Sequence, residues 1–277
     1  MPHLRFTRAF IYLGLVLAIL FGTAHAQTPA TFKIGVAPHT SARVILEMYQ
    51  PLRQQMEKAL GVPVEIVTAP DFTEYARRLL QQEYDMAITT GHQARLSQTD
   101  AGYTPLVTYS ADFRAVALVQ GNSTIKTAKD LTGKPVLGLS PSSLVTLWGL
   151  HWLEANGSKN NRVSFVSASD SVARLILTGE AAAGFSSLAN YQSLPRDVQA
   201  QLRFLVISEP MAGRVYMLSK RQAARKEKVD TALTAFADSA DGKAYFEKFK
   251  LEGYRKLKAK ELESMDRYAK EVRQSLK

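Results

Sequence analysis

Short apolar runs alternate with amphipathic stretches from residue 32 onward, and this pattern predicts strands followed by helices. The first such unit contains three predicted strands and two predicted helices. The strands are expected at residues 32–36, 64–68 and 85–89, and the helices at residues 44–60 and 71–82. Pro51 interrupts the first helical pattern and predicts a kink or a restart there.

The same order of elements returns later in the chain. Three segments align in sequence, with offsets of 103, 99 and 97 residues. They are residues 34–38 with 137–141, 64–71 with 163–170, and 76–90 with 173–187. Each unit is therefore β-α-β-α-β, which predicts an α/β fold of two similar, doubly wound lobes. We expect a parallel sheet with helices on both faces in each lobe.

Two extended segments, residues 114–119 and 214–219, are expected to cross between the lobes and to form a two-segment hinge. The predicted first lobe starts with residues 27–112 and the second comprises residues 113–214. Residues 215–277 are expected to return to the first lobe and to end in helices.

The N-terminus has the three parts of a secretory signal peptide. Arg5 and Arg8 precede an uncharged apolar run at residues 9–22, and Ala24-His25-Ala26 is a small-residue cleavage site. Such a signal peptide would direct the protein to the periplasm, and we expect it to be cleaved after Ala26. An uncleaved membrane anchor is the alternative, but the run is shorter than the ~20 residues that span a bilayer.

Composition narrows the class of protein further. With 46% hydrophobic residues and no cysteine, the chain is typical of a globular protein without disulfides. The net charge is +10, and the segment from Lys220 onward holds 16 basic and 10 acidic residues. We interpret that excess as solvated helical faces rather than a nucleic-acid site, and we expect a monomer.

Polar residues gather just beyond the predicted strands. Ligands of doubly wound sheets bind outside the carboxyl ends of the strands, where helix N-termini attract anions. Hydroxyl groups there add hydrogen bonds without adding charge. The alternative for each residue is a plain helix cap, since Ser, Thr and Asp are preferred caps. The candidates are Thr40, Ser41, Thr89, Thr90, His92, Ser140, Ser142, Ser143, Asp170 and Ser186.

Aromatic and basic residues flank these turns. Phe72 and Phe113 could pack on an organic group, although core packing is the alternative. Arg114 and Arg214, at the predicted crossings, could each bind an oxyanion with two hydrogen bonds, although plain surface charge is the alternative. His39 and His92 lack a nearby cysteine or a carboxylate at ligand spacing, so we expect neither a metal nor a cofactor.

The motifs of common enzyme classes are missing from the sequence. There is no G-x-S-x-G elbow, H-E-x-x-H helix, P-loop or G-x-G-x-x-G fingerprint. We therefore expect a binding protein rather than an enzyme. An exported enzyme that uses the same cleft remains the alternative from another class.

Taken together, residues 30–250 resemble the PhnD-like phosphate, phosphite and phosphonate-binding proteins of ABC importers, a branch of the type II solute-binding fold. The turn Gly138–Ser143, the segment Ala76–Thr90 and the crossing Ser208–Ser219 carry the resemblance. It implies a hinged receptor that closes on a small oxyanion and delivers it to a membrane permease. A same-fold receptor that signals to a sensor kinase is the alternative.

The sequence departs from that family at the site. Phosphonate binders of the family carry a Ser-Thr-Ser run where this chain has Ser143-Leu144-Val145, so two hydroxyl groups are lost. Family tyrosines that touch the phosphonate align with Phe72 and Phe113. These differences leave open another oxyanion or a less polar ligand.

Overall fold

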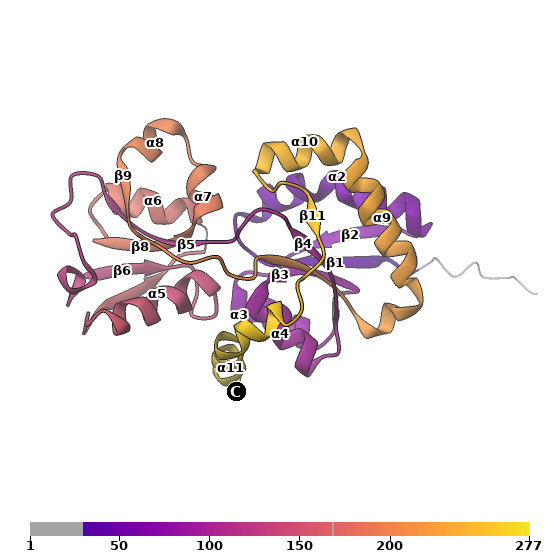
Figure 1. The fold of residues 1–277 in the computed structure, drawn as a ribbon, viewed down its shortest axis with the longest axis horizontal. Helices are drawn as coiled ribbons and strands as arrows, with labels where there is room; N and C mark the ends of the chain where they lie inside the picture. The colour runs from indigo at the N-terminus through magenta and orange to yellow at the C-terminus, as the bar shows by residue number, and fades with distance from the viewer. Residues whose placement is uncertain (1–29, 168) are drawn as a thin grey trace, which may run out of the picture. The chain divides into compact units, whose positions relative to one another are not determined.

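The computed structural model describes residues 30–167 and 169–277. Its strands form two sheets (Figure 1). The expected signal peptide, residues 1–26, lies outside the described residues. Among the described helices, none is both long and apolar enough to cross a membrane.

The first sheet combines early and late segments of the chain. Its strands are β1 (Phe32–Val36), β2 (Val64–Val67), β3 (Met86–Thr90), β4 (Thr104–Tyr109), β10 (Arg214–Leu218) and β11 (Tyr254–Arg255). Their order is β11-β4-β10-β3-β1-β2. Strand β1 pairs in parallel with β2 and β3, as predicted. Strand β3 is wholly buried and uncharged, as expected for a central strand covered on both faces.

The second sheet repeats this core with later residues. Its strands are β5 (Ala115–Gln120), β6 (Pro135–Gly138), β7 (Arg162–Phe165), β8 (Ala183–Ser187) and β9 (Leu202–Ile207). Their order is β7-β6-β8-β5-β9, and β6 pairs in parallel with β7 and β8. The predicted repetition of a three-stranded parallel core is therefore confirmed.

The expectation of purely parallel sheets is wrong, because each sheet holds an antiparallel strand inside it. Strand β5 runs antiparallel to β8, with Ala115 opposite Ser187, and β10 runs antiparallel to β3, with Arg214 opposite Thr90. Strand β5 begins beside the carboxyl end of β8, and β10 begins beside the carboxyl end of β3. The chain enters each sheet from that edge and must run in the opposite direction, which brings Arg214 to the edge where ligands bind.

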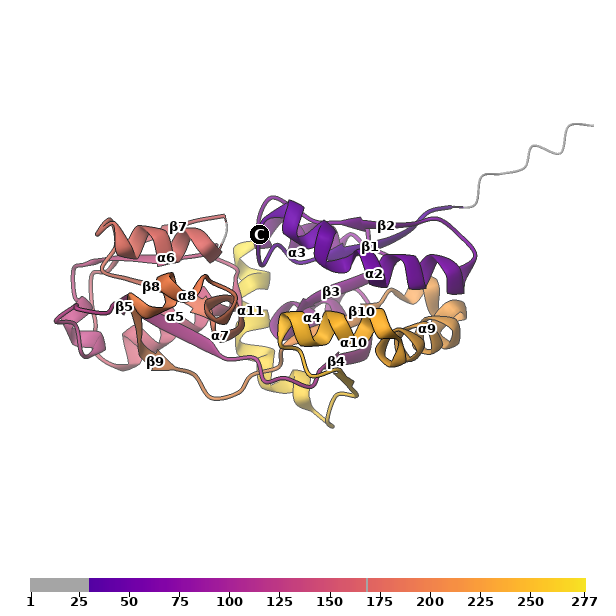
Figure 2. The ribbon, with the colours of Figure 1, turned by 90° about the horizontal axis from the view of Figure 1, so that it is seen from above.

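Helices cover both faces of the first sheet. They are α2 (Ala42–Leu60), α3 (Phe72–Leu80), α4 (Gly91–Asp100), α9 (Lys226–Asp238), α10 (Ala240–Phe249) and α11 (Asp266–Ser275), with short 3-10 turns η2 (Lys220–Arg225) and η3 (Glu261–Met265). Helices α9 and α10 pack on α2, and α11 packs on α4 (Figure 2). Helix α2 continues through Pro51, so no restart occurs, because a buried face from Ile45 to Met56 crosses that position.

Shorter helices accompany the second sheet. They are α5 (Leu144–Ala155), α6 (Ser169–Leu177), α7 (Leu188–Gln192) and α8 (Arg196–Ala200), with the 3-10 turn η1 (Ala128–Leu131). Helix α5 begins after the turn Ser140–Ser143, close to its predicted start, and the chain turns at Gly157 with a φ of 76°. That backbone conformation favours glycine and ends the helix as predicted.

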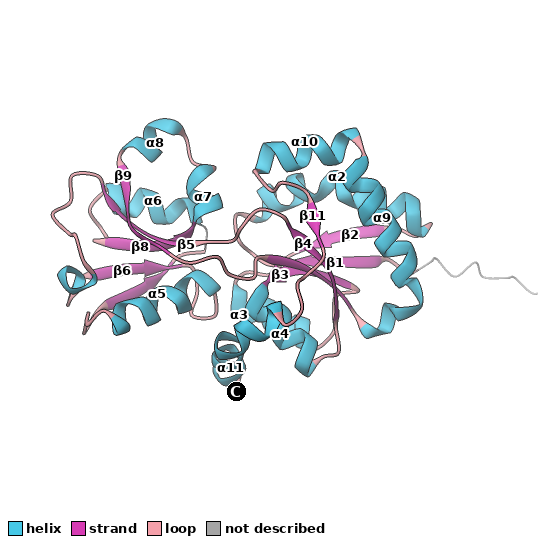
Figure 3. Ribbon diagram, viewed as in Figure 1, coloured by secondary structure: helices cyan, strands magenta, loops and turns pink. Residues whose placement is uncertain are grey.

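Two segments without helix or regular strand join the sheets (Figure 3). They connect β4 to β5 and β9 to β10, just before the strands that we expected to make the crossings. The two segments are hydrogen-bonded to each other through the Met211 N–H, which donates to the Phe113 carbonyl (2.9 Å). Beside this contact, the Ser208 N–H donates to the carbonyl of Ala115, the first residue of β5 (2.8 Å). The two sheets are therefore joined by two chain segments that lie side by side.

Candidate functional site

A small cavity, called the inner cavity here, lies where the carboxyl ends of the two parallel cores meet. Its volume is about 40 Å³. At 10–15 Å³ for each water-sized group, this is room for about three such groups. The lining comes from both sheets and from the hinge: Ala37, His39, Phe72, Thr90, Phe113, Leu139, Ser143, Leu144, Val145, Ser187, Ala189, Asn190 and Arg214.

Arg214 supplies the positive charge of the inner cavity. Its guanidinium donates hydrogen bonds to His39 Nε2 (3.0 Å) and to the Tyr49 hydroxyl (3.3 Å), and it lies 5.4 Å from the centre of the Tyr109 ring. Within residues 30–167 and 169–277, no carboxylate lies within 4.0 Å of its nitrogens. These neutral partners replace part of the lost hydration, but they leave the charge of this partly buried cation without a negative partner. This arrangement favours the binding of an anion.

His39 is held neutral beside this charge. Its Nδ1 lies 2.9 Å from the Ala37 carbonyl oxygen, which can only accept, so Nδ1 carries the hydrogen and Nε2 accepts from Arg214. Burial and the charge of Arg214 lower the pKa of His39 to about 3. At neutral pH the imidazole therefore orients Arg214 and adds no charge.

A cluster of five tyrosines lies behind Arg214. Their hydroxyl groups are linked: Tyr109 contacts Tyr216 (2.7 Å), Tyr245 and Tyr49 (3.4 Å), and Tyr254 donates to Tyr216 (2.8 Å). Burial raises the pKa of Tyr109, Tyr216, Tyr245 and Tyr254, which keeps these hydroxyls protonated. The tyrosine cluster thus supports the guanidinium with neutral oxygen atoms and an aromatic face rather than with a carboxylate.

The serine turn before α5 has mostly internal partners. Ser143 Oγ accepts from the Thr146 N–H (3.3 Å) and donates to Thr146 Oγ1 (2.8 Å), so it caps α5. The Oγ of Ser142 pairs with that of Thr73 (2.8 Å). The first amides of an α-helix have no partner inside the helix. Leu144 and Val145 line the cavity, and their amides have no hydrogen-bond acceptor among the described residues.

His92 joins the two halves of the site. Its Nε2–H donates to the Ser142 carbonyl (2.9 Å), and its Nδ1 accepts from the Thr90 hydroxyl (3.1 Å). The ring is fully buried, and burial lowers its pKa to about 4. Asn190 makes a third connection between the halves by donating to the His39 carbonyl (3.4 Å). These contacts hold the lobes together at the inner cavity.

Four of the predicted contacts line the inner cavity, namely Phe72, Thr90, Phe113 and Ser143. Others lie beside it in supporting positions. Ser140 bonds to Ser142 within the turn (3.3 Å between hydroxyls), while Ser142 and His92 make the connections described above.

The remaining predicted contacts lie elsewhere. Thr40 lines a neighbouring groove, and Ser41 caps α2. Thr89 donates to Gln93 (3.1 Å) inside the first lobe. Asp170 lines a separate pocket of the second lobe. Ser186 is buried in β8 and is absent from the cavity wall.

The two arginines at the crossings have different positions, and Arg114, the one predicted as a ligand contact, is absent from the wall of the inner cavity. Arg114 pairs with Asp112 (3.3 Å) and donates to the Ser208 carbonyl (3.1 Å) in the hinge, whereas Arg214 faces the inner cavity. Ser187 and Asn190, which line the inner cavity, were not among the predicted contacts. A matching signal existed for Ser187, since it ends the buried run of β8 as Thr90 ends that of β3.

No metal centre is evident in the part of the chain that the structure describes, where no three or more His, Asp or Glu side chains are grouped to hold an ion. The inner cavity is lined by hydrogen-bond donors and by one positive charge, that of Arg214.

Comparison with known proteins agrees with the fold. The most similar solved structures include XAC2383 from Xanthomonas citri bound to chloride ion (19% identity, TM-score 0.71, covering 88% of this chain and 99% of that one). The same protein bound to ATP has 18% identity and a TM-score of 0.72, covering 89% and 99%. PhnD1 from Prochlorococcus marinus with methylphosphonate has 14% identity and a TM-score of 0.77, covering 88% and 98%.

A comparison with curated protein sequences finds no match. Residues 34–262, however, match the family described as "ABC transporter, phosphonate, periplasmic substrate-binding protein". This match spans most of the chain and both sheets. The chain therefore belongs to the family of periplasmic substrate-binding proteins of phosphonate ABC transporters, and it is a solute-binding component rather than an enzyme.

Proposed function

We propose that the protein captures an oxyanion of the phosphonate or phosphate type, with the anionic head in the inner cavity on Arg214. The observation that carries this proposal is the guanidinium of Arg214, which faces the cavity and has no carboxylate partner among the described residues. A guanidinium can bind two oxygens of one tetrahedral head. The head's three oxygens also suit a space for about three water-sized groups.

Donors from the second lobe would complete the site. The free amides of Leu144 and Val145 lie at the positive end of α5, a helix of 12 residues. Phe72 and Phe113 wall the cavity without hydroxyl groups and exclude water, which strengthens the remaining electrostatic contacts. The head would thus depend on backbone amides and one arginine where the related binders use tyrosine and serine hydroxyls.

Ligand capture would close the hinge. Arg214 belongs to the first sheet and the α5 amides belong to the second, so one anion would contact both lobes only when they are together. Contacts that exist only in the closed form supply the difference in affinity that shifts the population toward it. The proposed lobes keep the expected bounds, residues 27–112 with 215–277 and residues 113–214, except that Arg214 is assigned to the first lobe because β10 begins there.

The family match indicates a periplasmic protein that works with an ABC permease. We propose further that residues 1–26 are removed on export, that the protein is a monomer, and that it binds no nucleic acid. Mass spectrometry of the protein isolated from the periplasm tests the cleavage after Ala26. Sedimentation at several concentrations tests the monomer, and a filter-binding assay with labelled DNA and RNA tests the last point.

Anion binding itself is tested by calorimetric titration with methylphosphonate, inorganic phosphate and sulfate. We expect at least one of them to bind, and we expect Arg214→Gln to weaken that binding by about 100-fold, since ~2–5 kcal/mol is typical for removal of one charged partner. The exposed Arg162→Gln, on strand β7, is the matched control. Binding that survives Arg214→Gln unchanged, or a protein that takes up only neutral compounds, would overturn the proposal.

A further inference from the structure

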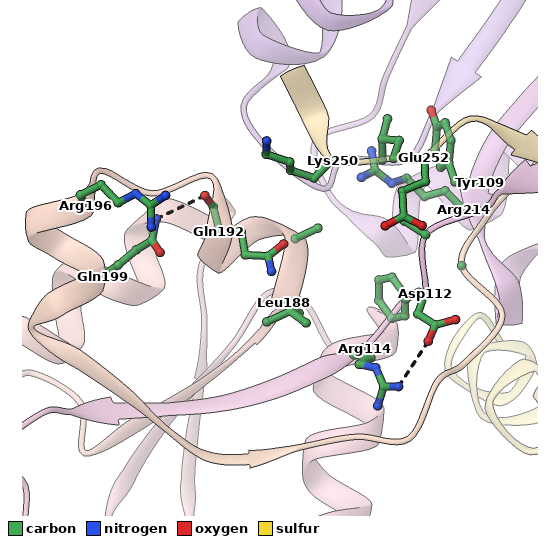
Figure 4. A pocket seen from close by; sticks show the side chains of 15 residues that line it. Tyr109, Asp112, Arg114, Leu188, Gln192, Arg196, Gln199, Arg214, Lys250 and Glu252 are labelled. Atoms are coloured by element: carbon green, nitrogen blue, oxygen red, sulfur yellow. Dashed lines mark hydrogen bonds and ion pairs between the residues drawn. The ribbon is translucent and has the colours of Figure 1, made fainter. Parts of the chain in front are cut away.

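A second, larger cavity opens beside the inner one and is called the outer cavity (Figure 4). Its volume is about 490 Å³, and it shares Arg214, Phe113 and Ala189 with the inner cavity. Both lobes and the hinge line it. Figure 4 shows Arg196 and Gln199 on one side and Lys250, Glu252 and Arg214 on the other.

The size of the outer cavity indicates a ligand with an organic part. Cavities of 300–1,000 Å³ are typical for small organic ligands, whereas the inner cavity has room only for an anionic head. Because Arg214 lines both, a head bound there would direct its substituent into the outer cavity. Apolar side chains of Phe113, Leu188 and Leu251 line part of that space and could contact methylene groups.

The charges of the outer cavity indicate what the substituent carries. Arg114 is neutralised by Asp112 at 3.3 Å. Arg196 and Lys250 make no ion pair with any carboxylate in the described part of the chain, and Glu252 is the one further acid on the wall. Apart from Arg214, two cations therefore stand against one anion. The surplus favours a negative group over an ammonium.

We propose that the ligand is a short organic phosphonate or phosphate ester with a second acidic group, which binds Arg196 and Lys250. This inference rests on the proposed function, since it requires the head on Arg214. Arg196 lies on α8 in the second lobe, and Lys250 follows α10 in the first. The second acidic group would therefore also be shared between the lobes and would add to closure.

Calorimetry with a set of phosphonates tests the inference. Phosphonoacetate and phosphonobutyrate carry a carboxylate, methylphosphonate carries no second charge, and aminoethylphosphonate carries an ammonium. We expect one of the two carboxylated compounds to bind about tenfold more tightly than methylphosphonate, which corresponds to ~1.4 kcal/mol. Aminoethylphosphonate should bind more weakly than either carboxylated compound. The tenfold gain should shrink in high salt, because Arg196 and Lys250 are exposed.

The double variant Arg196→Gln/Lys250→Gln should abolish that gain and leave the affinity for methylphosphonate within about twofold, while Arg162→Gln should change neither. Equal affinity for methylphosphonate and the carboxylated compounds, or a preference for aminoethylphosphonate, would overturn the inference and leave the proposed function intact. Failure of every phosphonate, phosphate and sulfate to bind would overturn the proposed function as well.

Discussion

The Nε2 atom of His39 accepts a hydrogen bond from the guanidinium of Arg214 across 3.0 Å, although 175 residues separate the two in sequence. A neutral imidazole thus occupies a position beside Arg214 where a carboxylate would cancel the charge. The arginine is oriented while its positive charge remains available to a ligand. Several expectations depend on this pair and on the contacts around it.

Removal of the imidazole should weaken anion binding more than it weakens the fold. In His39→Leu, Arg214 keeps its contact with Tyr49 but loses its other acceptor. A hydrogen bond to a charged group contributes ~1.5–3 kcal/mol, so we expect affinity for the bound anion to fall by about tenfold or more. Calorimetric titration measures this, with His39→Gln as the variant that restores an acceptor. Equal affinities in the wild type and His39→Leu would show that the imidazole does not position Arg214.

Acid should destabilise the protein through His92. The folded state lowers the pKa of His92 from the ordinary 6.5 to about 4, so the unfolded chain binds the proton more readily between these values. Stability is therefore lost as the pH falls from about 6.5 toward 4. For one fully buried group, the expected loss between about pH 7 and about pH 4.5 is ~2 kcal/mol. His39 adds to it in the same direction, since its pKa is lowered too.

Urea unfolding at the two pH values measures this loss. His92→Gln retains a donor for the Ser142 carbonyl and has no titrating ring. On acidification its free energy of unfolding should therefore fall by ~2 kcal/mol less than that of the wild type. An identical loss in the variant and the wild type would exclude His92 as the source.

The contact between Ser142 and Thr73 should favour the closed form. Ser142→Ala removes the 2.8 Å hydrogen bond between the lobes and leaves the cap of α5 on Ser143 intact. One such bond contributes ~1 kcal/mol, which predicts about a fivefold loss of ligand affinity and a larger radius of gyration in X-ray scattering without ligand. Ser143→Ala is the comparison: loss of the helix cap should lower the stability by ~1 kcal/mol. Unchanged affinity and scattering in Ser142→Ala would contradict the role of this contact.

The tyrosine cluster should matter for stability more than for binding. Tyr109→Phe retains the ring beneath Arg214 but leaves the hydroxyls of Tyr216 and Tyr245 without a shared partner. Buried groups that lose a partner cost ~1–3 kcal/mol, which we expect as a lower free energy of unfolding. The control is Tyr191→Phe, which loses a single hydrogen bond to the Gln199 carbonyl and should cost less. Equal stability losses in the two variants would argue against a cooperative cluster.

Local patterns in the sequence predicted much of the fold. The parallel strands, the caps and the glycine after α5 depend on neighbouring residues: Asp71, for example, accepts from the amides of Thr73 (2.8 Å) and Glu74 (2.9 Å) at the start of α3. Residues 114–119 and 214–219 were predicted to be extended, but the antiparallel direction of β5 and β10 was not, because it depends on where the chain enters each sheet. An apolar run of the same length serves either direction.

The site was harder to predict for the same reason. Hydroxyl residues at strand ends cap helices and also bind ligands, and the sequence does not distinguish the two uses, as Ser143 and Thr90 illustrate. Arg114 and Arg214 occupy similar places before crossing strands. Only the three-dimensional contacts separate the arginine that pairs with Asp112 from the one that pairs with neutral His39.

The most direct test of the proposed anion site at Arg214 is a crystal structure of the protein with methylphosphonate. The phosphonyl oxygens should lie within hydrogen-bond distance of the Arg214 guanidinium and of the Leu144 and Val145 amides, with the methyl group directed toward Phe113. A phosphonate bound elsewhere, with Arg214 in contact only with His39 and Tyr49, would contradict the account.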